Sequence, residues 1–139
     1  MLTDELVKLA RHDDELIAVA AHELGHIRHR HGLRQVMAGA GVMFLAQILI
    51  GEMGQIGDLA SGLPALLLQT GYTRAMEREA DADALALMRS ACLPPRRFAD
   101  ILSRLDAGEG AAATLFSTHP ATRERIKLFR AQELVARGC

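Results

Sequence analysis

An uncharged stretch of 17 residues, QVMAGAGVMFLAQILIG at positions 35–51, constrains the fold of this chain more than any other feature. A second uncharged stretch, LASGLPALLLQTGYT, follows at 59–73. Both are short or interrupted for a membrane-spanning helix, which needs about 20 apolar residues. Helices of this kind must cover their apolar surface, so we expect buried helices of a small bundle. The alternative is a helical hairpin that lies against a membrane or a neighbouring segment.

The rest of the sequence also favours helices over strands. Aromatic residues make up 4% of the 139 residues, and runs of strand-forming residues are missing. This length fits one domain, so we expect residues 1–139 to form a single, mainly α domain. Helical spacing, caps and prolines predict helices over about 4–11, 14–32, 34–50, 64–91, 96–106 and 120–136, with Pro64 in a first turn. An apolar stripe predicts the buried face of the second helix at Leu16, Val19, Ala20, Leu24 and Ile27.

Charge and cysteine content exclude several kinds of function. The formal net charge of −1 gives no reason to expect a nucleic-acid partner. Two cysteines, Cys92 and Cys139, are too few and too far apart for a disulfide framework or a thiolate metal site, so we expect two unpaired thiols. The amino terminus carries acids from Asp4 onward and lacks the apolar region of a signal peptide.

Four of the six histidines fall within AVAAHELGHIRHRHG, positions 18–32. His22 and His26 are four residues apart, which places both imidazoles on one side of a helix. With Glu23 they form H-E-x-x-H, in which two histidines bind zinc and the glutamate takes a proton from the activated water. Histidines near a buried helix face are costly unless a metal or hydrogen bonds satisfy them. The segment therefore predicts a catalytic zinc site.

The other histidines do not continue this pattern. An extended zinc motif would require glycine at position 29 and a third histidine at position 32, whereas the chain has His29 and Gly32. His29 and His31 follow the metal pair, among arginines. We expect these two residues and His12 to be solvated or locally hydrogen-bonded, and not to bind the metal.

A catalytic zinc needs a third protein ligand, and the segment YTRAMEREADADALALM at 72–88 offers one. Glu77 and Asp81 are four residues apart and share a helix face, whereas Glu79 points elsewhere. We expect Glu77 to bind the metal and Asp81 to accept the ring N–H of a ligating histidine. The alternative is a solvated helix face whose acids pair with nearby arginines.

The segment HELGH, together with Glu77 in EREAD 51 residues after His26, resembles the gluzincins that include HtpX, the CAAX prenyl proteases and the BepA-like proteases. These are zinc metalloendopeptidases of membranes and of the bacterial periplasm. The likeness covers nearly the whole chain, from TDELVKLARHDDELIAVAAHELGH to STHPATRERI at 117–126. It implies a zincin-like helical catalytic core with one Zn²⁺ per chain, held by His22, His26 and Glu77, and with Glu23 as the general base.

The resemblance also implies roles for residues around the ligands. Asp81 would hold a ligating histidine, and Arg74 matches the arginine that the family has three residues before its acidic ligand. Arg125 would anchor the last helix by pairing with acids near the site. His119 precedes Pro120, so its backbone is extended, and it would stabilise the oxyanion or occupy the open zinc position. A helix-entry residue without a catalytic role is the alternative for His119.

The activity implied is hydrolysis of polypeptide substrates in membrane or envelope protein quality control. The family's edge strand, which would hold substrate as an added strand, precedes the zinc helix, and this chain begins at about the point where that strand would end. We therefore expect the excised core of a longer bacterial envelope protein, membrane-associated or periplasmic, that contacts a membrane or a neighbouring domain through residues 35–71. Two alternatives are a catalytically weak, protease-like zinc-binding scaffold or interaction module, and a helical domain without metal.

Overall fold

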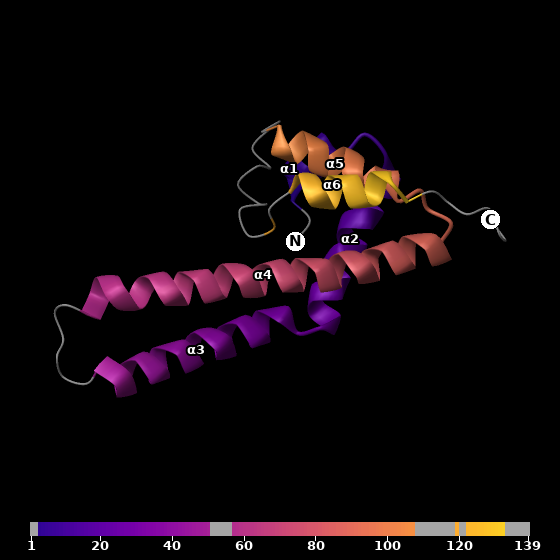
Figure 1. Ribbon diagram of the computed structural model, residues 1–139. Coiled ribbons are helices and arrows are strands. Elements are labelled where there is room, and N and C mark those ends of the chain that lie inside the picture. The colour runs from indigo at the N-terminus through magenta and orange to yellow at the C-terminus, as the bar shows by residue number, and fades with distance from the viewer. Residues whose placement is uncertain (1–2, 51–56, 108–118, 120–121, 133–139) are drawn as a thin grey trace. The chain divides into compact units, whose positions relative to one another are not determined.

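The computed structural model describes residues 3–50, 57–107, 119 and 122–132, with side chains except those of 42–50 and 57–72. Within these ranges all regular structure is helical (Figure 1). The helices are α1 (Asp4–Leu9), α2 (Asp13–Arg28), α3 (His31–Ile50), α4 (Gly57–Ser90), α5 (Arg96–Asp106) and α6 (Arg123–Arg130). The prediction of a mainly α fold is confirmed.

The chain divides into two compact units. The first unit comprises Met1–Gly25 and Ala80–Cys139, and the second comprises His26–Glu79. The division falls inside α2 and α4, so each of these helices contributes to both units. In the second unit, α3 and the part of α4 up to Glu79 are consecutive helices that run in opposite directions (Figure 1). The prediction of a single domain stays a prediction.

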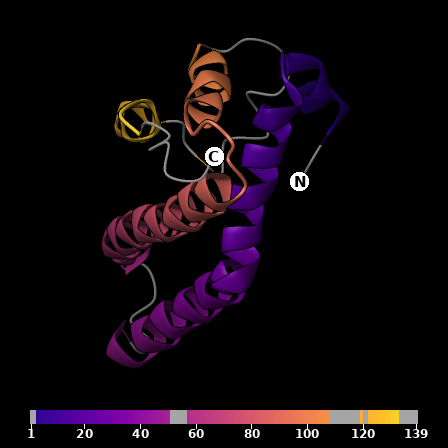
Figure 2. The ribbon, with the colours of Figure 1, turned by 90° about the vertical axis from the view of Figure 1, so that its right-hand side faces the viewer.

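The core of the first unit is built around α5 and α6, which pack side by side (Figures 1 and 2). The rings of Phe98 and Phe129 meet edge to face with centroids 4.7 Å apart. Apolar residues of α5 recur at helical spacing, so one face of this helix is fully buried. The buried residues around the two rings include Val19, Ala84, Met88, Ile101, Leu102, Leu105 and Ile126.

The buried face of α2 differs from the predicted apolar stripe. The members of that stripe that are exposed are Ala20, Leu24 and Ile27. The buried residues of α2 are Glu15, Ala18, Val19, Ala21, His22 and Gly25. Apolar spacing predicts the wrong face because Glu15 and His22 are polar but have buried partners, and a polar group is tolerated in a core when it is hydrogen-bonded. Glu15 accepts hydrogen bonds from the Arg104 side chain and, at 2.9 Å, from the Arg11 backbone N–H.

Gly25 of α2 lies close to the backbone of α4 in the first unit. A Cβ atom at Gly25 would lie 2.9 Å from Ala80 Cα and 3.1 Å from the Ala80 carbonyl oxygen. Both neighbours are backbone atoms, which cannot rotate away as a side chain can. The missing side chain at position 25 is therefore what lets the two helices meet here.

We expect Gly25→Ala to lower the free energy of unfolding by about 1–3 kcal/mol, because the added methyl group must displace the α4 backbone. Gly39→Ala is the matched control, since a Cβ atom at Gly39 of α3 meets nothing within 4 Å. There the change should raise stability by up to about 1 kcal/mol through helix propensity. Urea denaturation of both variants checks this, and stabilisation by both would contradict the close approach.

The break between α2 and α3 comes earlier than predicted. Helix α2 ends at Arg28, where a helix to Gly32 was expected, and α3 begins at His31. Arg30 lies between them with φ 53°, and its N–H donates to the Ile27 carbonyl at 3.0 Å. A residue in the left-handed region ends a helix in this way. The sequence offers no glycine or asparagine at position 30 to signal it.

Of the other predicted helices, α5 has the predicted bounds, whereas α4 begins earlier than predicted. The range predicted for α5, 96–106, is confirmed. Helix α4 begins at Gly57, so Pro64 lies inside the helix and the expectation of a first-turn proline is wrong. Helix α6 begins after Thr122, whose Oγ1 accepts the Arg125 N–H at 3.4 Å. The expected start at Pro120 and end near residue 136 lie outside the described residues.

The apolar stretch at 35–51 forms most of α3. Leu33, Val36 and Met37 are 58%, 68% and 64% exposed, so the expectation of buried helices is wrong for this part of α3. The side chains of 42–51, and those of 59–72 in α4, lie outside the described residues. No helix in the described part of the chain is both long enough and apolar enough to cross a membrane.

Cys92 follows α4 with φ 57°, and the next N–H, of Leu93, donates to the Met88 carbonyl at 2.8 Å. This is the hydrogen bond that commonly ends a helix. Cys92 is disulfide-bonded, so the expectation of a free thiol is wrong for this residue. Separation along the sequence does not fix separation in the fold, which is why the prediction failed. Cys139 lies outside the described residues.

Candidate metal centre

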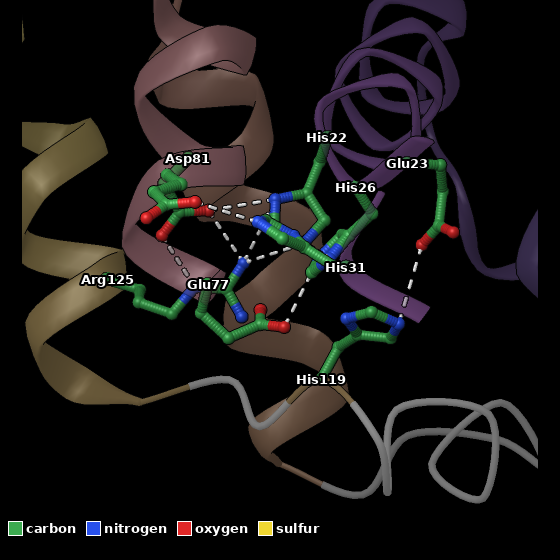
Figure 3. Close-up of polar contacts among 9 residues, drawn as sticks. His22, Glu23, His26, His31, Glu77, Asp81, His119 and Arg125 are labelled. Atoms are coloured by element: carbon green, nitrogen blue, oxygen red, sulfur yellow. Dashed lines mark hydrogen bonds and ion pairs between the residues drawn. The ribbon is translucent and has the colours of Figure 1, made fainter. Parts of the chain in front are cut away.

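Helix α2 carries the three residues of H-E-x-x-H on an uninterrupted stretch of backbone. His22 and His26 lie one turn apart on α2, so their rings project to the same side of the helix (Figure 3). His22 is 1% exposed, while Glu23 and His26 are half-buried. The four-residue spacing of the two histidines is therefore one turn of helix.

In the first unit, His22 is held by an aspartate and an arginine (Figure 3). His22 Nδ1 lies 3.0 Å from Asp81 Oδ1. Arg125 donates to both oxygens of Asp81, from Nε and Nη2, at 2.7 Å each. Arg125 Nη2 also lies 3.4 Å from His22 Nε2, but its shorter and charge-assisted bond goes to Asp81. A carboxylate only accepts hydrogen bonds, so His22 carries its proton on Nδ1 and keeps a lone pair on Nε2.

Asp81 stays ionised although it is only 1% exposed. Burial by itself would raise the pKa of its carboxyl group, but the hydrogen bonds from His22 and Arg125 outweigh this effect and the pKa is lowered. Asp81 is therefore a carboxylate at neutral pH. Both partners donate to it, which fixes the orientation of the His22 ring.

In the second unit, His26 Nε2 lies 3.2 Å from Glu77 Oε1, and Glu77 is 6% exposed (Figure 3). Ligand atoms on a tetrahedral zinc ion with bonds of about 2.0–2.1 Å stand about 3.3 Å apart. The imidazole nitrogen and the carboxylate oxygen are thus spaced as two ligands of one ion would be. Nitrogen and oxygen donors of this kind also suit zinc chemically.

Glu23 and His119 form a second polar pair in the first unit. His119 Nε2 lies 3.8 Å from Glu23 Oε1, and both side chains are half-buried (Figure 3). The ring of His119 also contacts the edge of the His22 ring, with centroids 5.6 Å apart. Glu23 is thus directed to His119, while the neighbouring His22 is held by Asp81. This separation suits a glutamate that handles protons and does not bind the metal.

His31 is a buried histidine of the second unit. It was expected to be solvated or locally hydrogen-bonded, and it is hydrogen-bonded but only 2% exposed. Its Nδ1 lies 2.7 Å from His26 Nδ1, and its Nε2 lies 3.0 Å from Glu79 Oε2. In one continuous helix, a residue five positions after His26 would face elsewhere. The break at Arg30 brings His31 back to His26, and the sequence carries no clear signal of it.

Glu79 and His31 each shift the pKa of the other. Hydrogen bonds from His31 and then from Arg34 lower the pKa of Glu79 to about 2. Burial lowers the pKa of His31, although its hydrogen bond to Glu79 acts in the opposite direction. At neutral pH Glu79 is therefore a carboxylate and the His31 ring is neutral.

The remaining candidates lie at or near the surface. His12 is exposed, as expected, and His29 is half-buried with its ring stacked on that of His31 at 5.3 Å between centroids. Arg74 lies on α4 and is exposed. The structure does not test the roles that the resemblance implies for Arg74 or for the ligands.

Two helices that supply H-E-x-x-H and an acidic pair four residues apart define the helical core of a zincin. A profile of Peptidase family M48 matches residues 1–133, and the chain belongs to this family. Metalloproteases of this family depend on zinc in general. The gluzincin resemblance seen in the sequence is thereby confirmed.

Three relatives illustrate the similarity. The chain is 33% identical over 128 residues to "Mitochondrial metalloendopeptidase OMA1" of Schizosaccharomyces pombe, covering 88% of this chain and 37% of the relative. It is 33% identical over 153 residues to "Protease HtpX homolog" of Acaryochloris marina, covering 81% and 51%. It is 30% identical over 123 residues to "Metalloprotease LoiP" of Escherichia coli, covering 85% and 49%. The chain spans about half or less of these relatives, and no solved structure matches it.

Proposed function

We propose that this chain is the catalytic core of a zinc-dependent metalloendopeptidase that hydrolyses polypeptides. Family membership supports this, as do the relatives named metalloendopeptidase, protease and metalloprotease. The observation that carries the proposal is the 3.2 Å separation of His26 Nε2 and Glu77 Oε1, next to a helix that presents H-E-x-x-H. Two such donors at this spacing are suited to share one ion.

In this proposal His22, His26 and Glu77 hold one zinc ion per chain. Asp81, itself held by Arg125, keeps the proton of His22 on Nδ1 and so leaves Nε2 for the metal. Arg74 belongs to the surroundings of Glu77 by resemblance alone.

A bound zinc ion supplies a Lewis acid that lowers the pKa of a water to about 7 and polarises a peptide carbonyl. Glu23 takes the proton of the attacking water and returns it to the leaving amine. His119 lies 3.8 Å from Glu23 and is proposed to stabilise negative charge that develops on the carbonyl oxygen. The half-buried position of both side chains leaves them accessible to a substrate.

We infer a location in the bacterial cell envelope, where the protein would act on membrane or envelope polypeptides. The exposed apolar residues Val36 and Met37 support contact of the segment 35–71 with a membrane or a neighbouring domain. A relative named as mitochondrial shows that similar proteins also occur in another compartment.

Metal analysis tests the proposed function directly. We expect about one zinc per chain by mass spectrometry for the parent protein purified without added metal, and much less for Glu77→Ala. Glu124→Ala removes an exposed carboxylate from α6 and is the control, which should keep its zinc. A folded parent that binds no zinc when the metal is supplied would contradict the proposal, and unchanged zinc in Glu77→Ala would show that the third ligand is wrong.

A further inference from the structure

The second ring nitrogen of His26 faces another imidazole. While Nε2 of His26 faces Glu77, its Nδ1 lies 2.7 Å from Nδ1 of His31 (Figure 3). The His31 ring stands nearly perpendicular to that of His26, at 76° and 4.8 Å between centroids. Two nitrogens at this distance form a hydrogen bond, so one of them carries a proton and the other a lone pair.

The contact between His31 and Glu79 determines which nitrogen of the His26–His31 pair is the donor. Its Nε2 lies 3.0 Å from Glu79 Oε2, and a carboxylate accepts hydrogen bonds only. Nε2 of His31 must therefore carry the proton. A neutral imidazole has one N–H, so Nδ1 of His31 is the acceptor and Nδ1 of His26 is the donor. Two acceptors compete for the single proton of His26, and His31 Nδ1 at 2.7 Å is closer than Glu77 Oε1 at 3.2 Å. His26 is left with a lone pair on Nε2, which is the form that binds a metal.

Arg34 holds the end of this chain of hydrogen bonds. Its Nη1 donates to the same oxygen of Glu79 at 2.7 Å. His29, His31 and Glu79 could by spacing alone hold an ion of their own, since their ligand atoms lie within 4.8 Å of one another. The guanidinium on Glu79 Oε2 opposes a second cation at that oxygen, because like charges repel strongly at this distance. The arrangement favours a hydrogen-bonded support for His26 over a second metal site.

We propose that His31 is a positioning residue for the metal ligand His26: it accepts the Nδ1–H of His26 and, supported by Glu79 and Arg34, keeps Nε2 of His26 unprotonated and aimed at Glu77. The inference rests on the proposed zinc function. His22 has a comparable support in Asp81 and Arg125, so each histidine of H-E-x-x-H has its Nδ1–H bound by a partner. Partners of this kind typically change metal affinity by about 10–100-fold.

His31 and His29 differ in their contacts with Glu79, so His29 provides a control. His29 is stacked on His31, and its Nδ1 lies 3.8 Å from Glu79, beyond hydrogen-bonding distance. His31→Leu removes the acceptor, His31→Asn offers a carbonyl oxygen in its place, and His29→Leu is the matched control for local packing. We expect zinc affinity, measured by competition with a chromophoric chelator, to fall about 10–100-fold in His31→Leu. His31→Asn should recover most of this loss, and His29→Leu should bind like the parent.

A second readout needs no metal. Long-range ¹H–¹⁵N NMR of the metal-free parent protein should show His26 protonated on Nδ1 and His31 on Nε2. In His31→Leu the proton of His26 should redistribute toward Nε2. A structural role of His31 alone would not change this tautomer.

Several results would overturn the inference. These are a proton on Nε2 of His26 in the folded metal-free parent, parent-like zinc affinity in His31→Leu, and a second bound zinc that His31→Leu removes. A parent that binds no zinc at all would contradict the proposed function instead, and the tautomer of His26 would then decide the role of His31 by itself.

Discussion

Glu23→Gln is expected to keep one zinc per chain while peptide hydrolysis falls about a hundredfold or more. The amide has the shape of the carboxylate but cannot take a proton from the attacking water. Glu23 is half-buried on α2, so the exchange should cost little stability. Hydrolysis of a quenched fluorescent peptide gives kcat, and metal analysis of the same sample gives zinc content.

The control for this experiment is Glu124→Gln, the same exchange at an exposed position of α6, which should hydrolyse peptide at the parent rate. A Glu23→Gln protein that cleaves as fast as the parent would rule out Glu23 as the general base. A parent that binds zinc but does not cleave peptide or casein would favour the zinc-binding scaffold that the sequence also allows.

Arg125→Met is expected to lower the free energy of unfolding by about 3–5 kcal/mol. The variant leaves the carboxylate of Asp81, which is 1% exposed, without the guanidinium that donates to both of its oxygens. An uncompensated buried charge costs far more than a lost surface ion pair. Arg123→Met is the control, because Arg123 is exposed on the same helix and should change stability little.

The double variant Arg125→Met with Asp81→Asn separates charge from packing. Removing the buried charge together with its partner should cost less than the sum of the two single changes. Denaturant unfolding of the four proteins gives this coupling energy. Strict additivity would show that Arg125 stabilises the first unit through packing against Phe98, whose ring centroid lies 5.8 Å from the guanidinium carbon, and not through Asp81.

The sequence predicted the elements that depend on local spacing. Helix α5 lies where prolines 94 and 95 and its apolar pattern place it, and the four-residue spacing of His22 and His26 becomes one turn of α2. Helix geometry repeats every 3.6 residues, so the relation between these two histidines follows from the sequence once the segment is helical.

The errors arose where a distant partner decides the outcome. Leu24 and Ile27 are exposed although their spacing is that of a buried stripe, because Glu15 on the opposite face is paired with Arg104 of α5. Local propensities are a few tenths of a kcal/mol to about 3 kcal/mol per residue, so tertiary contacts can override them.

By itself, the sequence determined the mainly α fold, the H-E-x-x-H motif of α2 and, with the family resemblance, the class of chemistry. Only the tertiary structure decided that His31 contacts His26, that Asp81 is the acid with which Arg125 pairs, and that His31 is buried. Residues close in sequence are placed by helix geometry, whereas contacts 44 or 48 residues apart, such as Asp81 with Arg125 and His31 with Glu79, depend on how whole helices pack.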